Sequence, residues 1–428
     1  MTSLPAMTSV LGASMTTSVD ACLATAQACL ARGEGEQALR AMQEAAQGAP
    51  DNPAVLAGLG VALRFNGQLA AAAEAFSRCL AVQPQRADAQ VYLGMIRLAQ
   101  GQQKEGWALY RARWRYANWT EKLRYPQETL WQGRVGAGMR LLLWCEQGFG
   151  DAIQFARYAP WLQRLLHAQG GSLVLEAPAP LCALLRDSWP FMEIVASGQV
   201  RGRFDAHLPL LDLPLCWGGL VGAEGLPYVP LPLPYLSALP DPRAEQRGAV
   251  RLPVVQERAL RVGIAWQGRP THPDDRWRSV QPDQLTALFA VPGVRWVSLQ
   301  KDGQAHPTWL PDDLAHCRDF ADTARIIDTL DMVISIDSAI AHLAGALDKP
   351  VWLLLPRIAD WRWQLTGEST PWYPGMRLFR QGAEENWAAV ATRVAAALSR
   401  HREATALSRH READFSPRHR EAAGRGDP

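Results

Sequence analysis

Asp337 and Ser338 stand directly after a short apolar run, where a parallel strand would bring them to the edge of a sheet. Residues 332–336 have strand length, and residues 340–347 repeat apolar side chains at the 3.6-residue period of a helix. Ser338 then occupies the N-cap, and the N–H groups that follow, beginning with Ala339, have no partner inside the helix. The pattern predicts a phosphate site, with a purely structural cap as the alternative.

His342 lies one helical turn beyond Ser338 on the same face of this predicted helix. It is placed to contact a phosphate or a sugar there, while a packed histidine in the core is the alternative. Asp337 is placed to bind a ribose or the amide groups of the turn. Asp337, Ser338, Ala339 and His342 are therefore the candidate ligand-binding residues of this turn.

A second glycine-containing turn follows the apolar run 140–145 and opens a helix that the pattern predicts over residues 152–167. Gly148 and Gly150 allow a tight turn and the close approach of a ligand, and Asp151 lies in the first helical turn, where the helix dipole favours a carboxylate. A capped turn without a ligand is the alternative.

A third polar stretch follows the predicted strand 261–266. Gln267 begins it, and Arg276 and Arg278 follow in the same loop. Fixed cations in such a loop would stabilise the negative charge on a departing phosphate oxygen, and Arg278 and Arg276 are the candidates, with a solvated surface arginine as the alternative for Arg276. Gln300 and Lys301 follow the next predicted strand, where a base and a ribose would lie.

The sequence shows no metal-ligand spacing of His, Cys and carboxylates and no Asp-x-Asp pair. We therefore expect no metal and no other cofactor.

The N-terminal third repeats with a period of 34 residues. Glycines stand at 33, 67 and 101, and prolines at 50 and 84. This period and its small and aromatic positions are typical of tetratricopeptide repeats. We expect an α-helical solenoid over residues 19–118, with an atypical last repeat.

Strands and helices alternate after the repeats, which is βαβ order. The segment 226–253 is rich in proline, which disfavours a central strand, so we place a connection there. The expected divisions are a junction at 119–139, a first α/β half at 140–245, a linker at 246–259, a second half at 260–398 and a low-complexity tail at 399–428. In that tail Arg-His-Arg-Glu-Ala occurs three times, and we expect it to be disordered or partly helical.

Composition excludes several classes of protein. The 428 residues carry a formal net charge of +2, all of it supplied by the tail, which argues against nucleic acid as a partner. No apolar run approaches the roughly 20 residues that span a bilayer. The seven scattered cysteines and the absence of an early basic segment favour a cytoplasmic protein without a signal peptide.

Several separated motifs resemble the heptosyltransferase-like glycosyltransferases of family 9. The resemblance covers residues 128–382 and includes the runs 337–347, 349–352, 360–363, 369–374 and 376–381, together with the turn 148–151. A fusion of such a domain to tetratricopeptide repeats is typical of bacterial proteins and is distantly similar to the O-linked N-acetylglucosamine transferases. The resemblance implies an α/β GT-B fold of two Rossmann-like domains.

The resemblance also implies roles for these residues. Asp151 matches the proposed general base, Arg278 matches a cation at the leaving diphosphate, and the turn at Asp337 matches the nucleotide-sugar site. We expect an inverting, metal-independent glycosyltransferase that moves a sugar from a nucleotide-sugar to a hydroxyl of a protein or glycan acceptor. Arg269 replaces an asparagine of the family, so the contacts of its loop differ.

Two other functions fit the sequence. A lipopolysaccharide-type heptosyltransferase would use an ADP-sugar, although that reaction needs no peptide-binding repeats. A non-catalytic scaffold would use the transferase-like domain as a packing platform, although it would need neither Asp151 nor Arg278. The repeats themselves either bind the acceptor or brace the domain that follows.

Overall fold

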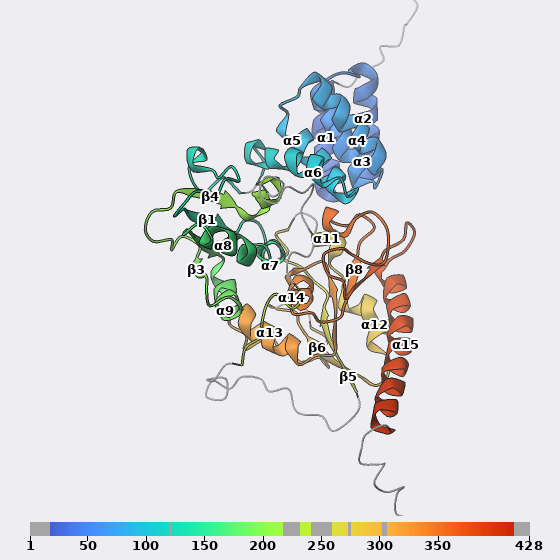
Figure 1. Ribbon diagram of the computed structural model, residues 1–428. Helices are drawn as coiled ribbons and strands as arrows, with labels where there is room; N and C mark the ends of the chain where they lie inside the picture. Colours follow the sequence, from blue (N-terminus) through green and yellow to red (C-terminus); the bar gives the residue numbers. More distant parts are fainter. Residues whose placement is uncertain are drawn as a thin grey trace, which may run out of the picture. The chain divides into compact units, whose positions relative to one another are not determined.

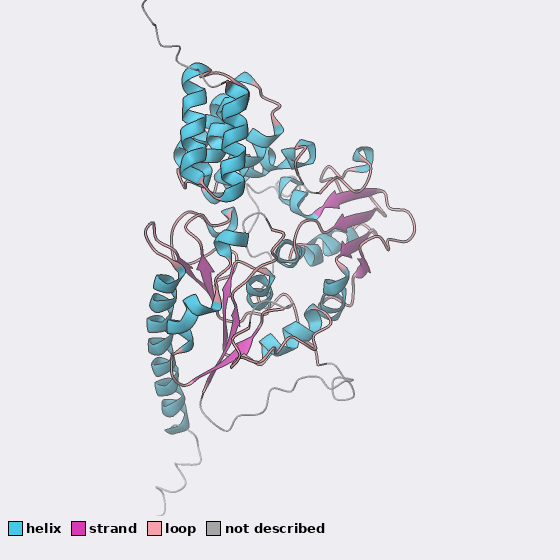
Figure 2. Cartoon of the chain, turned by 180° about the vertical axis from the view of Figure 1, so that it is seen from behind, coloured by secondary structure: helices cyan, strands magenta, loops and turns pink. Residues whose placement is uncertain are grey.

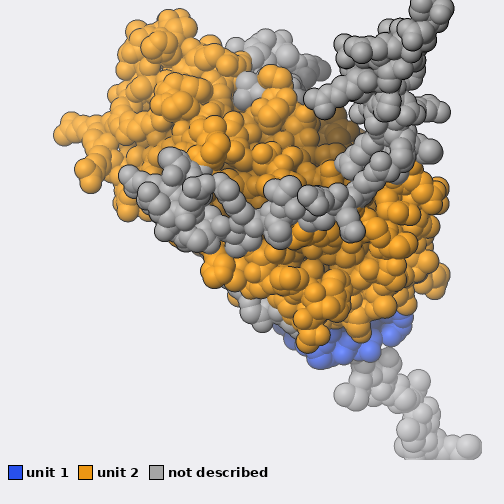
Figure 3. Space-filling view, turned by 90° about the horizontal axis from the view of Figure 1, so that it is seen from below, with its two compact units in different colours: residues 1–98, 105–119 blue, residues 99–104, 120–428 orange. Residues whose placement is uncertain are grey.

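The structure is a computed structural model. It describes residues 18–119, 121–216, 232–240, 259–272, 275–301 and 306–414, with side chains described as far as residue 404. The chain divides into two compact units, one of residues 1–98 and 105–119, the other of residues 99–104 and 120–428 (Figure 3).

The first unit is built from helices that follow one another in pairs (Figure 1). The helices are α1 (Val19–Arg32), α2 (Gly35–Gly48), α3 (Pro53–Phe65), α4 (Leu69–Val82), α5 (Ala87–Ala99) and α6 (Gln103–Tyr110). After the first helix of each pair comes Gly33, Gly67 or Gly101, with φ of 88°, 75° and 78°. Glycine adopts this left-handed conformation without strain, which explains the spacing of 34 residues.

Small residues let the two helices of a pair approach closely, as the repeat pattern predicts. A Cβ added at Gly60 would lie 2.6 Å from Phe76 Cε1, and one added at Gly94 would lie 2.8 Å from the Tyr110 backbone nitrogen. The last pair is atypical, because α6 has only eight residues and a 3₁₀ helix over Arg111–Arg115 follows it.

The second unit contains two parallel sheets within the described residues, and Figure 2 shows both from behind. Its first half has strands β1 (Arg140–Trp144), β2 (Ser172–Ala177), β3 (Glu193–Ala196) and β4 (Ala206–Pro209) in the order β3-β2-β1-β4. The strands are all parallel, with Leu142 of β1 opposite Val174 and His207. The helices of this half are α7 (Phe149–Ala156), α8 (Ala159–His167) and α9 (Ala179–Ser188).

The single helix expected over residues 152–167 is wrong, because the chain forms α7 and α8 with a break at Arg157 and Tyr158. Pro160 explains the break. Within a continuous helix its ring would clash with the carbonyl of Ala156, whereas it fits the first turn of a new helix.

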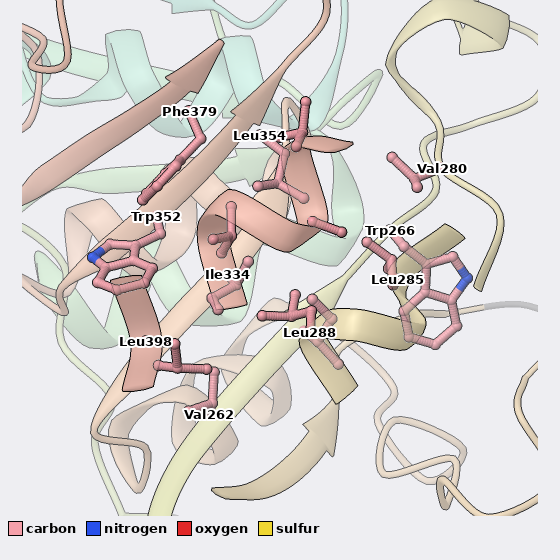
Figure 4. Close-up of a cluster of buried hydrophobic side chains, with 14 of the residues drawn as sticks. Val262, Trp266, Val280, Leu285, Leu288, Ile334, Trp352, Leu354, Phe379 and Leu398 are labelled. Atoms are coloured by element: carbon pink, nitrogen blue, oxygen red, sulfur yellow. The ribbon is translucent and has the colours of Figure 1, made fainter. Parts of the chain in front are cut away.

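The second half has five parallel strands in the order β6-β5-β7-β8-β9. They are β5 (Leu260–Ala265), β6 (Val294–Ser298), β7 (Met332–Ile336), β8 (Val351–Leu355) and β9 (Met376–Arg380), with helices α11 (Asp275–Arg278), α12 (Thr286–Phe289), α13 (Phe320–Asp328), α14 (Ala339–Ala346) and α15 (Trp387–Asp414). Alternate strand residues pack with α12 and α15 in one buried cluster, which includes Ile334 and Leu288 (Figure 4). These two sheets and the helices before them confirm the predicted fold class.

The last helix continues into the tail, which the sequence predicts to be disordered or partly helical. Helix α15 runs to Asp414, so the first half of the tail is helical. Its alanine, arginine and glutamate residues favour a helix, and no glycine or proline interrupts it. The rest of the tail and nearly all of the predicted linker 246–259 lie outside the described residues.

A buried polar cluster holds the segment before β1 against the first sheet. Glu176 is fully buried, and it accepts hydrogen bonds from Tyr125 Oη at 2.9 Å and from the Gly198 N–H at 2.7 Å, besides an ion pair with Arg124 at 3.0 Å. His207 is also fully buried, with Nδ1 3.1 Å from Trp144 Nε1. Because the indole nitrogen can only donate, Nδ1 must accept.

The tautomer of His207 follows from these contacts. Its Nε2 carries the proton and donates to the carbonyl of Pro126 at 2.8 Å. A proton on Nδ1 would face the N–H of Trp144, so the site accommodates the neutral ring. Burial accordingly lowers the pKa of His207 below its usual value near 6.5.

Acid should therefore destabilise the second unit. Below about pH 6.5 this histidine binds a proton in the unfolded chain but remains neutral in the folded protein. The free energy of unfolding therefore falls as the pH is lowered. We expect urea unfolding at pH 5.5 to show a lower stability than at pH 7.5. The variant His207→Gln, which cannot titrate, should show a weaker pH dependence. An equal pH dependence in the two proteins would contradict the buried neutral histidine.

Candidate functional site

The turn that carries Asp151 is fixed by its own hydrogen bonds. Gly148 precedes α7 as its N-cap in an extended conformation, and its N–H donates to Asp151 Oδ2 at 2.8 Å. Glu146, just before the turn, is buried and accepts from the backbone N–H of Leu211 at 3.1 Å. Asp151 is thus held in the first turn of the helix, as the sequence predicts.

Helix α7 of the first half packs against α14 of the second half, and Gly150 lies at their contact. A Cβ added at Gly150 would lie 2.8 Å from His342 Cδ2 and 3.7 Å from Ala339 Cα. A side chain at this position would therefore force His342 to shift. Two turns predicted separately from the sequence, one with Asp151 and the other with Ser338, are brought side by side.

The start of α14 leaves backbone donors available. Ser338 is the N-cap, but its hydroxyl lies 3.1 Å from Ser335 Oγ and does not cap the helix. The Ser338 carbonyl accepts from the N–H groups of Ala341 and His342. In the described part of the chain, the N–H groups of Ala339 and Ile340 have no hydrogen-bond acceptor, so they are free to bind an anion.

His342 is buried and held as a neutral ring. Its Nδ1 lies 2.9 Å from Tyr373 Oη, and its ring stacks on Trp363 at a centroid distance of 5.3 Å. Burial lowers its pKa well below the usual value, and the positive charges of Arg362, Arg157 and Arg278 lower it further. His342 can therefore contact a ligand as a neutral hydrogen-bonding group and not as a cation.

Asp337 directly precedes α14, and its carboxylate has a less polar environment than a carboxylate at the protein surface has. Burial raises its pKa to about 6, and the negative charge of Asp360 acts in the same direction, while Arg278 opposes both. Asp337, Asp360 and Arg278 therefore lie within electrostatic reach of one another at the carboxyl end of β7.

Arg278 is placed by α11 and by the loop that follows β5. Its Nε lies 3.4 Å from Asp275 Oδ1, and a Cβ added at Gly268 would lie 2.7 Å from its Nη2. The arginine side chain therefore lies along the backbone of the loop. The positive charge of Arg278 acts on Asp337, and the guanidinium of Arg276 lies 5.0 Å from the ring centroid of Trp277.

The side chain of Gln300 bonds to the loop that follows β5. Its side-chain oxygen accepts from the N–H groups of Trp266 and Gln267 at 3.2 and 3.0 Å, and its Nε2 donates to the Gln267 carbonyl at 3.2 Å. Gln300 thus fixes the loop after β5. The buried Gln267 Oε1 has no partner within the described residues, and Lys301 is exposed, with Nζ 3.4 Å from the Cys317 carbonyl.

Three residues that the sequence interpretation did not assign complete this region. Arg362 forms an ion pair with Asp151, Trp363 stacks on His342, and Tyr373 bonds to His342. All three lie in the runs 360–363 and 369–374. The alternation of tryptophan and arginine in the first run was the available signal.

Two kinds of feature are absent from the described residues. No group of three or more His, Cys, Asp and Glu side chains there is arranged to hold a metal ion. None of the described helices combines the length and the apolar character needed to cross a membrane.

Enlarging Gly150 should disturb the contact of α7 with α14. In Gly150→Ala the new methyl group would overlap His342, which we expect to cost about 1–3 kcal/mol of unfolding free energy. Thermal and urea unfolding measure this loss. Gly375→Ala is the matched control, because a Cβ there meets no atom within 4 Å. If both variants are equally stable, α7 does not pack on α14 as described.

Comparison with known proteins returns the two kinds of protein that the motifs predict. No family model matches the chain. The protein FlbA of Caulobacter vibrioides is 27% identical over 71% of this chain and 53% of its own length, so the chain spans about half of that relative.

Solved structures give similarities to each part of the chain. The TPR domain of Sgt2 from Aspergillus fumigatus covers 24% of this chain and 69% of its own, with 26% identity and a TM-score of 0.22. The match to the iron-containing dodecameric glycosyltransferase TibC of enterotoxigenic E. coli covers 59% of this chain and 64% of the TibC chain, with 17% identity and a TM-score of 0.40.

The O-GlcNAc transferase of Thermobaculum terrenum is similar along most of the chain. It covers 90% of this chain and 91% of its own, with 15% identity and a TM-score of 0.27. The chain joins tetratricopeptide-like repeats to an α/β part with two parallel sheets, and its structural neighbours include a TPR domain and glycosyltransferases.

Proposed function

We propose that this protein is a glycosyltransferase that moves a sugar from a nucleotide-sugar to a hydroxyl group of a protein or glycan. The observation that supports the proposal most is the packing of Gly150 on His342 and Ala339. It sets a carboxylate, Asp151, beside a helix start with free backbone donors. An acceptor hydroxyl and a donor diphosphate would meet at this point.

The donor diphosphate would bind at the start of α14. The N–H groups of Ala339 and Ile340 would donate to its oxygens, and Arg278 would supply a full positive charge. Gln267 Oε1 and Lys301 would bind the base and ribose at the neighbouring strand ends. The helix start and Arg278 supply charge where other transferases use Mg²⁺, so we propose a metal-independent reaction.

The transfer step follows from the same arrangement. Asp151 would accept the proton of the acceptor hydroxyl, whose oxygen forms a bond to the anomeric carbon. The bond from that carbon to the diphosphate oxygen breaks, and its electron pair stays on the diphosphate, which Arg278 and the helix start stabilise. A single displacement of this kind inverts the anomeric centre.

Two substitutions separate the proposed roles. Asp151→Asn should leave donor binding unchanged and reduce turnover by about 10²–10⁴-fold, because the base is lost. Arg278→Ala should weaken donor binding, because it removes a cation from the diphosphate site. Calorimetry with UDP-, ADP- and GDP-sugars and a transfer assay with the best donor measure both effects.

The matched control is Arg261→Ala, since Arg261 lies near the opposite, amino-terminal end of β5. It should bind donors as the wild type does. If no nucleotide-sugar binds, or if Asp151→Asn transfers sugar at the wild-type rate, the proposed function is wrong.

The repeats would position the acceptor. Removal of residues 1–118 should then reduce transfer to a protein acceptor more than transfer to a free glycan. A transfer assay with the two acceptors, with donor binding as the check on folding, measures the difference. An equal loss on both acceptors would show that the repeats only brace the transferase domain.

A further inference from the structure

Arg362 connects the two halves of the second unit at the proposed base. It lies in a short 3₁₀ helix of the second half, Trp361–Trp363, yet its guanidinium bonds to two residues of α7 in the first half. Nη2 donates to Asp151 Oδ1, and Nε donates to Gln154 Oε1 at 2.7 Å. Asp151 and Gln154 are three positions apart, so one guanidinium contacts the same face of α7 twice.

The guanidinium is also fixed from its own side. Nη1 donates to Asp360 Oδ1 at 2.9 Å, and the plane lies over the Trp361 ring at 4.3 Å. Only 7% of Arg362 is exposed. An arginine with each of its three nitrogens bonded and one face stacked has a single orientation.

A second arginine fixes the loop that carries Arg362. Arg380, at the end of β9, donates to the carbonyls of Trp363, Gln364 and Gly367. Gln364 has φ of 60°, a backbone conformation that residues other than glycine rarely adopt. The loop therefore depends on the contacts of Arg380.

We infer that Arg362 is a positioning residue that orients Asp151 for proton transfer and does so only when the two halves are together. The inference rests on the proposed function. One carboxylate oxygen of Asp151 is held by Arg362 and the other by the Gly148 N–H, so the remaining lone pairs have a fixed direction. Arg362 belongs to the half that would bind the donor. Its contact with Asp151 would therefore fix the carboxylate of the base next to the bound donor.

A double-mutant cycle distinguishes this role from a simple clamp between the halves. If Arg362 acts only through Asp151, Arg362→Gln should lower kcat by about 10²-fold in the wild-type background, the loss typical of a misplaced catalytic group. In the Asp151→Asn background it should have no further effect. Donor affinity from calorimetry should stay within about twofold of the wild type, because Arg362 contacts the base and not the diphosphate.

Gln154→Leu is the matched control. It removes the hydrogen bond of Arg362 to Gln154 and leaves the Asp151 pair in place, so it should cost stability and little kcat. Arg362→Lys keeps the charge and should retain more activity than Arg362→Gln. If Arg362→Gln does not fold, Arg362→Lys replaces it in the double-mutant cycle.

Three results would overturn the inference. The first is that Arg362→Gln lowers kcat by the same factor in the wild-type and the Asp151→Asn backgrounds. The second is that Gln154→Leu lowers kcat as much as Arg362→Gln does, and the third is that Arg362→Gln keeps the wild-type kcat. If Asp151→Asn is fully active, the proposed function itself fails. If Asp151→Asn is inactive but the effects of the two substitutions on kcat are additive, the proposed function stands and Arg362 only holds the two halves together.

Discussion

The contact between Gly150 and His342 is the constraint on which the rest of the site depends. A helix start from each half comes within van der Waals distance, and a Cβ at Gly150 would press on the ring of His342. The Asp151 turn and the free donors of α14 then share one region. If α7 lay a side chain further away, neither turn would have a partner from the other half.

Charged groups of both signs surround this contact. Asp151, Asp337 and Asp360 face Arg278 and Arg362, and the only imidazole described at this contact, His342, is held neutral by burial and by nearby arginines. A diphosphate would add negative charge next to Arg278. Asp151, which pairs with Arg362, lies in the first half, and Arg278 lies in the second. Under the proposed function, the acid–base role and the charge-stabilising role would thus come from different halves.

Much of the fold could be predicted from the sequence, because its signals are local. The spacing of 34 residues reflects left-handed glycines, and each apolar run that ends in polar residues became a strand with those residues at its carboxyl end. Asp151 and Ser338 were found in this way. The split of the helix at Pro160 was also readable from the sequence and was missed.

The pairing of side chains across the halves could not be predicted. Arg362 reaches Asp151 over 211 positions, and no local pattern reports such a contact. The amide of Gln300 turns back to the loop after β5, although its position at a strand end favours a ligand contact. Both outcomes depend on tertiary packing, which decides how a polar side chain satisfies its hydrogen bonds.

The most direct measurement is a crystal structure of the protein with a nucleoside diphosphate bound. The diphosphate should lie within hydrogen-bond distance of the N–H groups of Ala339 and Ile340, with Arg278 at its oxygens and Asp151 on the opposite side of the anomeric position. A nucleotide bound elsewhere, with the start of α14 empty, would contradict the assignment of this region as a glycosyltransferase site.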